Sequence, residues 1–230
     1  MRGYATRLAV VLALVATPAT AKRPAPAGFA EPGDIIAAEG TLTRLGNEKG
    51  MKAAYRATAA PDAEIFAPQL MRIDAFVKNV SETNLAKNWH TRQLWMSCDG
   101  SYGVSYGEWR MQPALGWYIM IWHRQKGGAY KWVLNENGPL SAPLPDSDMI
   151  SAGVADCPTR RRVDSSAKPA RTPEPARPPI TDYTSHHADD DTMTWTTAVA
   201  ADNSQTFSLS LKQDGAMREV LHTGTAAPSH

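Results

Sequence analysis

Glu39 is the carboxylate in this sequence best placed for acid or base chemistry. It follows Ile35 by four residues and precedes Leu42 by three, so it falls on the apolar stripe of a predicted helix. A carboxylate on a buried stripe must be paired, face a cavity or stay protonated, because burial penalises its charged form. Two roles stay open: a general acid or base with a raised pKa, or a structural carboxylate at the edge of the stripe.

His123 is the matching candidate on a predicted strand. By alternation it shares one face with Trp117, Ile119 and Ile121. If that face lines a cavity, an imidazole there can move protons near neutral pH; otherwise it is a half-exposed residue at a strand end. Three aromatic residues are candidates for the pocket wall, with core packing as the alternative role: Tyr55, Trp95 and Tyr118. The residue types assign no catalytic residue.

The segment HHADDD, His186 to Asp191, holds the densest group of metal-ligating residue types. It follows a proline-rich segment and lacks the spacing of a known ligand set, so a weak divalent-cation site is the lesser interpretation and a solvated loop the better one. The sequence has no glycine-rich phosphate loop, and no GxSxG nucleophile elbow is expected. We expect no metal and no cofactor.

The N-terminal segment has the features of a secretory signal peptide. Arg2 and Arg7 precede the apolar run LAVVLALVA, and a small-residue cleavage pattern ends at Ala21. The run is shorter than the roughly 20 residues of a membrane-spanning helix, although a retained anchor is the alternative. We expect cleavage after Ala21, a mature chain that begins near Lys22 in the periplasm or outside the cell, and no stable membrane insertion after cleavage.

Export decides how the two cysteines are interpreted. In an oxidising compartment Cys98 and Cys157 are expected to form a disulfide, with two free thiols as the alternative. Closing a loop of this length would stabilise the fold by about 4 kcal/mol in the chain-entropy model. The formal charge of +1 and the 20% of charged residues disfavour a nucleic-acid partner.

The elements that must position these residues change from helical to alternating patterns along the chain. Helices are expected at residues 34–46, 49–58 and 69–80, and strands at 64–67, 92–98, 104–111, 116–125 and 129–136. In the first helix Asp34 is the expected N-cap and Gly46 the expected C-terminal stop, and in the third Leu70 should point inward. Helices followed by an antiparallel meander indicate an α+β fold with helices on one face of a curved sheet.

The expected strand at residues 116–125 is apolar on both faces. An antiparallel strand with one solvated face would alternate between apolar and polar residues, so both faces of the sheet should be covered. The helices cover one face. The other is covered either by a second copy of the chain, which gives a homodimer through the sheet face, or by the C-terminal segment.

Composition divides the chain into segments. Residues 22–33 are an expected flexible lead-in to a domain at 34–157, and residues 158–181 a basic, proline-rich linker. Residues 182–230 form a C-terminal extension with short strands expected at 191–200, 206–212 and 217–223. Such a small β-meander is marginally stable alone, so we expect it to dock onto the main domain.

Three stretches of the sequence resemble SnoaL-like proteins of the nuclear-transport-factor-2-like superfamily. DIIAAEGTLTRLGNEKGMKAAYRATAAPDAEIFAP is similar to the family's first helices and its D-x-x-x-F-x-P strand, with Asp62, Phe66 and Pro68 in those places. WMSCDGSYGVSYGEW and WYIMIWHRQKGGAYKWVLNENG resemble its last hairpins. The resemblance covers about residues 34–138.

The resemblance implies an exported bacterial member with a cone-shaped barrel, the cystatin-like α+β fold, and a pocket at one end. The superfamily contains isomerases, dehydratases, hydrolases and non-catalytic binders, and Trp95 and Trp117 are bulky for the pocket of an isomerase. We expect a small-ligand-binding or scaffold domain for a small apolar ligand. The alternative is a cofactor-free isomerase, dehydratase or hydrolase, which requires Glu39 and His123 to face one cavity.

Overall fold

The computed structural model describes residues 30–66, 69–85, 88–111, 113–157, 180–202 and 204–225. The expected signal peptide, most of the lead-in, Pro68 and residues 158–179 of the expected linker lie outside this part of the chain. In the described residues, all helices lie before Leu85 and only strands follow, which confirms the α+β class. No helix in the described ranges is both long enough and apolar enough to cross a membrane.

The first helix, α1 (Pro32–Lys49), is longer at both ends than expected. Pro32 stands at the start of the helix, where its fixed φ is already helical and its missing N–H is not needed. Asp34 therefore lies in the first turn and donates its backbone N–H to the carbonyl of Glu31, at 2.9 Å, so the expected N-cap role of Asp34 is wrong.

Gly46 does not end α1, because its role is close packing rather than termination. It is buried within the helix, and a Cβ there would collide with Sδ of Met51 at the start of α2 (Met51–Thr58). The helix ends instead at Gly50, whose φ of 87° is the positive value that glycine adopts freely. One face of α2 is turned inward, with four residues buried: Met51, Ala54, Tyr55 and Thr58.

The third helix, α3 (Ile73–Asn79), is shorter than expected. The residues before it form strand β2 (Leu70–Arg72), which pairs antiparallel with β1 (Ala59–Phe66). Leu70 is 48% exposed, so the prediction that it points into a helical core is wrong. The backbone groups of residues 70–72 form hydrogen bonds with β1, so they are not available to extend the helix.

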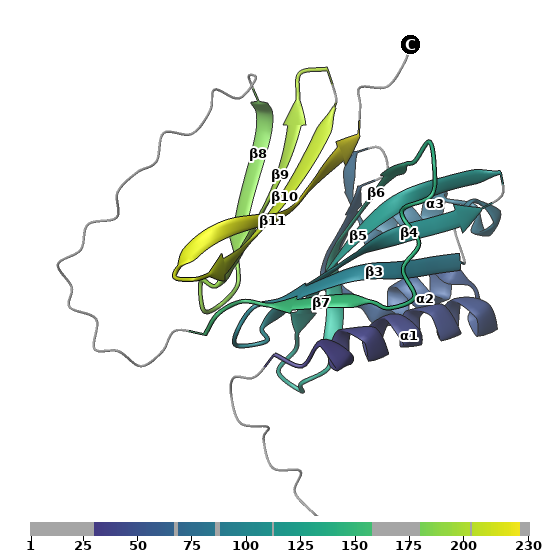
Figure 1. The fold of residues 1–230 in the computed structure, drawn as a ribbon. Coiled ribbons are helices and arrows are strands. Elements are labelled where there is room, and N and C mark those ends of the chain that lie inside the picture. Colours follow the sequence, from purple (N-terminus) through teal and green to yellow (C-terminus); the bar gives the residue numbers. More distant parts are fainter. Residues whose placement is uncertain are drawn as a thin grey trace, which may run out of the picture.

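The large sheet has seven strands in the order β2-β1-β6-β5-β4-β3-β7. Its remaining members are β3 (Asn88–Met96), β4 (Tyr102–Met111), β5 (Ala114–Arg124), β6 (Tyr130–Pro139) and β7 (Ser151–Val154). The predicted meander β3 to β6 is antiparallel, but β1 pairs parallel with β6 and β7 pairs parallel with β3. The sheet is therefore mixed, and it curves around the helices (Figure 1).

The C-terminal strands form a separate sheet. It contains β8 (Ile180–His187), β9 (Met193–Ala200), β10 (Gln205–Gln213) and β11 (Ala216–Thr225), all antiparallel and in sequence order. Strand β8 was not expected, and its start at Ile180 lies within the expected linker. Figure 1 shows this sheet, in green to yellow, on the side of the large sheet away from the helices.

Strand β5 separates two hydrophobic cores. Tyr118, Met120 and Trp122 face the helices, whereas Ile119 and Ile121 face the C-terminal sheet. The second core is completed by buried residues of β9 and β10: Met193, Trp195, Phe207, Leu209 and Leu211. The chain's own C-terminal segment thus covers the second apolar face. A homodimer stays a prediction, and it would need a surface other than this covered area.

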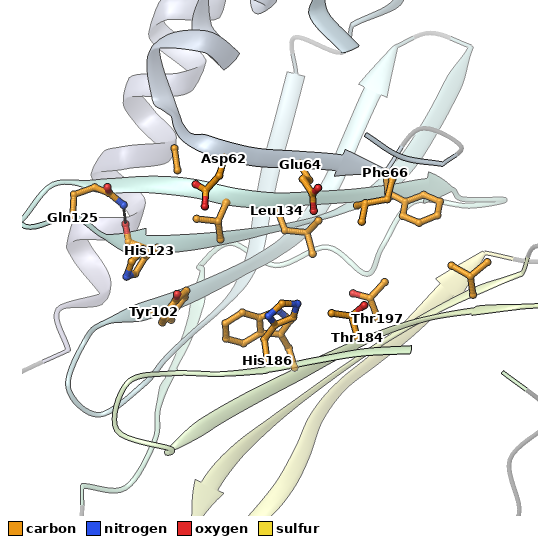
Figure 2. A pocket seen from close by; sticks show the side chains of 15 residues that line it. Asp62, Glu64, Phe66, Tyr102, His123, Gln125, Leu134, Thr184, His186 and Thr197 are labelled. Carbon is orange, nitrogen blue, oxygen red and sulfur yellow. Dashed lines mark hydrogen bonds between the residues drawn. The ribbon is translucent and has the colours of Figure 1, made fainter. Parts of the chain in front are cut away.

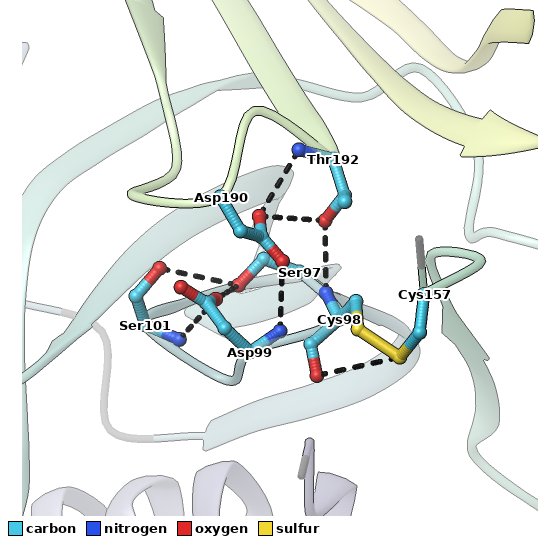
Figure 3. Close-up of a disulfide and its surroundings, with 7 residues drawn as sticks. All are labelled: Ser97, Cys98, Asp99, Ser101, Cys157, Asp190 and Thr192. Atoms are coloured by element: carbon cyan, nitrogen blue, oxygen red, sulfur yellow. Dashed lines mark hydrogen bonds between the residues drawn. A yellow bond between two sulfur atoms is a disulfide. The ribbon is translucent and has the colours of Figure 1, made fainter. Parts of the chain in front are cut away.

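The predicted disulfide between Cys98 and Cys157 is present. Cys98 lies in the turn between β3 and β4, and the same turn holds the loop between β8 and β9 (Figure 3). The Cys98 N–H donates to Oγ1 of Thr192, and the Asp99 N–H donates to Oδ2 of Asp190, both at 2.9 Å. This turn therefore fixes one end of the C-terminal sheet against the large sheet.

Candidate functional site

A cleft of about 630 Å³ lies between the two sheets. Its walls come from β1, β4, β5 and β6 on one side and from β8 and β9 on the other. Figure 2 shows Asp62 and Glu64 on β1, with His186 and Thr184 on β8 across the open space. Neither sheet alone encloses this space, so the C-terminal extension forms half of the candidate site.

A row of aromatic rings lines the cleft. His123 stacks on Tyr102, with ring centroids 4.4 Å apart and an interplanar angle of 12°. Tyr102 in turn contacts Trp195 at 5.0 Å, and His186 stacks on Trp195 at 5.4 Å and 16°. The row runs from β5 through β4 to β9 and β8, so it bridges the two sheets. Such a surface suits flat or apolar ligand groups.

Beside the aromatic row, the part of the wall formed by β1 combines two carboxylates with apolar side chains. Alternation along β1 places Asp62, Glu64 and Phe66 on the face that lines the cleft, while Ala63 and Ile65 point into the helix-facing side. Leu134 of β6 and Val199 of β9 extend the apolar lining. The cleft therefore offers apolar contact area together with a few polar groups.

Glu39 lies on the other side of the sheet, at a small cavity of about 30 Å³. Thr91 Oγ1 donates to Glu39 Oε2, and the Tyr118 hydroxyl donates to Glu39 Oε1 at 3.4 Å. Burial raises the pKa of Glu39, while hydrogen bonds from Ser105, Thr91 and Tyr118 lower it. Burial, followed by the charge of Glu39, raises the pKa of Tyr118 well above its ordinary value. The cavity has room for about one water molecule.

The structure does not bring Glu39 and His123 together. Glu39 contacts Tyr118 on the helix-facing side of β5, whereas His123 stacks on Tyr102 in the cleft between the sheets. The body of the large sheet separates the two side chains. They therefore cannot act on one substrate as an acid and base pair.

The other two candidate residues contribute to packing. Tyr55 is 3% exposed and contacts Trp132 edge-on, with centroids 5.6 Å apart, in the core beneath the helices. Trp95 is buried in the core between the sheets, where a Cβ at Gly153 would lie 3.1 Å from its ring. Of the five candidates, only His123 lines the large cleft, and Glu39 and Tyr118 share the small cavity.

Glu136 of β6 is a buried carboxylate between the two sheets. It is 1% exposed and accepts a hydrogen bond from Oγ1 of Thr197, a residue of the cleft wall, at 2.8 Å. Burial raises the pKa of Glu136 to about 7, although the hydrogen bond from Thr197 lowers it. Near neutral pH this carboxyl is therefore partly protonated.

The residues of the HHADDD segment lie in two places: at the cleft, and against the turn between β3 and β4, called here the docking turn. His186 lines the cleft, His187 contacts Asp191 at 2.8 Å, and Asp190 holds the turn after Cys98. Among the residues that the structure describes, no group of three or more histidine, cysteine, aspartate or glutamate side chains is arranged to hold a metal ion.

Sequence reasoning missed most of the cleft lining. Trp195 belongs to a strand that was predicted, whereas Tyr102 lies just before the strand expected at residues 104–111, and no pattern indicated that the two meet. Asp62 was noted only as a family motif residue and His186 only as a weak metal ligand. Alternation along residues 59–66, had that strand been predicted at full length, would have put Asp62 and Glu64 on one face.

No protein-family model matches the chain, and no curated protein sequence matches it. Similar solved structures include an NTF-2 like protein of unknown function from Silicibacter pomeroyi, 15% identical, covering 48% of this chain and 99% of that chain with a TM-score of 0.37. The S. rosetta CaMKII hub is 12% identical and covers 51% of this chain and 98% of that chain, with a TM-score of 0.36. A Shewanella frigidimarina protein named as a proposed ketosteroid isomerase is 10% identical over 46% of this chain and 92% of that chain, with a TM-score of 0.35. With TM-scores below 0.5, these similarities carry no argument about activity.

Proposed function

We propose that this chain is an exported small-ligand-binding protein of the SnoaL-like type, and that its ligand binds in the cleft between the two sheets. The single observation that carries the proposal is the cleft of about 630 Å³ with its aromatic row. Cavities of roughly 300–1,000 Å³ with apolar walls and few polar groups are typical of small-molecule sites. The signal-peptide features at the N-terminus and the resemblance at residues 34–138 support export and the family.

Binding is favoured over catalysis by the placement of the ionisable groups. Glu39 and Tyr118, whose pKa values burial raises, line a cavity of about 30 Å³ that has no room for an organic substrate. His123 lines the large cleft without Glu39. The alternative, a cofactor-free enzyme that uses this pair, therefore gains no support.

A pair of neighbouring variants tests the cleft. Thr184 and Ser185 are adjacent and exposed on β8, and only Thr184 lines the cleft. Thr184→Trp should fill the cleft and weaken binding of the uncharged dye Nile red at least about tenfold, whereas Ser185→Trp, on the other face, should leave binding unchanged. Dye fluorescence titrations measure both affinities, and thermal unfolding checks that both variants fold. If the two variants bind Nile red with equal affinity, the dye does not bind in the cleft.

Native mass spectrometry of protein purified from its own host tests the remaining parts of the proposal. The mass of the subunit shows whether the mature chain begins at Lys22, as cleavage after Ala21 requires. The same spectrum shows the number of subunits and any retained small molecule. A mass equal to that of residues 1–230 would refute cleavage of the signal peptide, and the proposal that the cleft binds a ligand would still stand.

A further inference from the structure

The fixed charges that line the cleft have one sign. Asp62 and Glu64 point into it, and the described lining residues include no lysine or arginine. Within the described part of the chain, neither carboxylate has a hydrogen bond or an ion pair. Two unpaired carboxylates on one wall give the cleft a negative potential.

Two cations on the strands beside β1 are bound to its main chain. The guanidinium of Arg72 donates to the carbonyls of Pro61 and Asp62, at 2.6 and 3.0 Å. Nζ of Lys131 donates to the carbonyl of Ala59 at 3.1 Å. These groups reduce the negative potential without closing an ion pair, so both carboxylates remain available to a ligand.

The aromatic row faces the same charge. Burial, and after it the negative charges of Asp189 and Asp62, raises the pKa of Tyr102. The faces of aromatic rings are electron-rich and attract cations that lie over them. The carboxylates and the ring faces that line the cleft thus favour the same kind of ligand group.

Resting on the binding function proposed above, we propose that the ligand is an organic cation. Its amine or quaternary ammonium group lies between the carboxylates of β1 and the aromatic row, and its apolar body packs against Phe66, Leu134 and Val199. An anion of the same shape is repelled by Asp62 and Glu64. A neutral ligand gains the apolar contacts but not the charge pairing.

Three probes of equal size separate charge from shape: 4-phenylbutylamine, 4-phenylbutan-1-ol and 4-phenylbutanoate. Titrations of the full chain at neutral pH, followed by tryptophan fluorescence and calorimetry, measure their affinities. We expect the amine to bind about tenfold more tightly than the alcohol, which corresponds to two partly exposed ion pairs, and the acid to bind weakest. The double variant Asp62→Asn, Glu64→Gln should bring amine and alcohol to within about twofold while leaving the alcohol's affinity unchanged. The exposed Asp148→Asn is the matched control and should change nothing.

The outcomes separate this inference from the binding function. If the alcohol binds and the amine binds no better, or if the double variant keeps the preference for the amine, the cation inference is overturned and the cleft remains a ligand site. If the acid binds tightest, the cation inference is likewise overturned. If none of the three binds at millimolar concentration, both proposals are overturned.

Discussion

Two carboxylates, the half-buried Glu39 and the buried Glu136, stand on opposite sides of the large sheet. Each accepts a hydrogen bond from a threonine, and neither has a basic partner among the described residues. Burial raises the pKa of both. A carboxyl that is neutral in the fold and charged in the unfolded chain makes stability depend on pH.

Glu136→Gln should flatten the pH dependence of stability. The folded-state pKa of Glu136, about 7, lies above the ordinary 4.5, so between these values the folded chain binds one more proton than the unfolded chain. The group's stabilising contribution is therefore complete below about pH 4.5 and lost as the pH rises through about 7. The loss amounts to about 3 kcal/mol at most, so the variant should approach or exceed wild-type stability at pH 8 but not at pH 5.

Urea unfolding of wild type and Glu136→Gln across this pH range measures the effect. Glu39 also makes the free energy of unfolding fall as the pH rises, in both proteins, since its pKa is also raised. The exposed Glu31→Gln should follow the wild type at every pH. Parallel pH profiles for wild type and Glu136→Gln would show that Glu136 does not carry this slope.

At the residue scale, burial could be predicted from sequence and partners could not. The position of Glu39 on the helical stripe correctly indicated a carboxylate whose pKa burial raises. Its partner Thr91 lies 52 residues away, and Tyr118 lies 79 residues away. Helical periodicity describes which face of an element is buried, but it carries no information about which strand packs there.

At the scale of elements, the two apolar faces of β5 predicted two covering layers, and the structure has them. The alternatives for the second layer, a second copy or the C-terminal segment, stayed open because alternation does not identify the covering partner. Strand β8 was missed because its residues, ITDYTSHH, lack alternating apolar side chains. Its pairing with β9 sets its conformation instead, so neighbouring strands override local sequence preference.

Phe207→Ala should loosen the C-terminal sheet more than the large sheet. Phe207 is fully buried between the sheets, and such a truncation costs about 3–5 kcal/mol. Because a cleft of about 630 Å³ leaves part of this interface open, we expect the sheets to separate before the helix-facing core unfolds. Amide hydrogen exchange should accelerate in β9 and β10 more than in β5.

The control for this variant lies next to it. Thr206 is exposed on the same strand, so Thr206→Ala should change stability by about 0.5 kcal/mol or less. Equal acceleration of exchange in β5 and β10 of Phe207→Ala would contradict the expectation, because it would mean that the two sheets unfold as one unit.

At the scale of the whole molecule, the cleft exists because two sheets face each other and are held together beside it. The turn after β3 binds the loop before β9 through Thr192 and Asp190. Near this turn, the Asp156 N–H donates to the carbonyl of Lys212 at 2.8 Å. Motif matching at residues 34–138 described the first layer alone, so it could not predict a site that requires the second.

The disulfide joins this docking turn to the point where the chain leaves the large sheet. Cys98 and Cys157 are 59 residues apart, and the crosslink restricts the unfolded chain over that loop. We expect the double variant Cys98→Ser, Cys157→Ser to lose about 4 kcal/mol of unfolding free energy, chiefly because its unfolded state gains entropy. Urea unfolding with and without dithiothreitol measures this loss. Reductant should lower the wild type to the level of the variant and leave the variant unchanged; a reduced wild type as stable as the oxidised one would show that hydrogen bonds and apolar contacts alone hold the two sheets together.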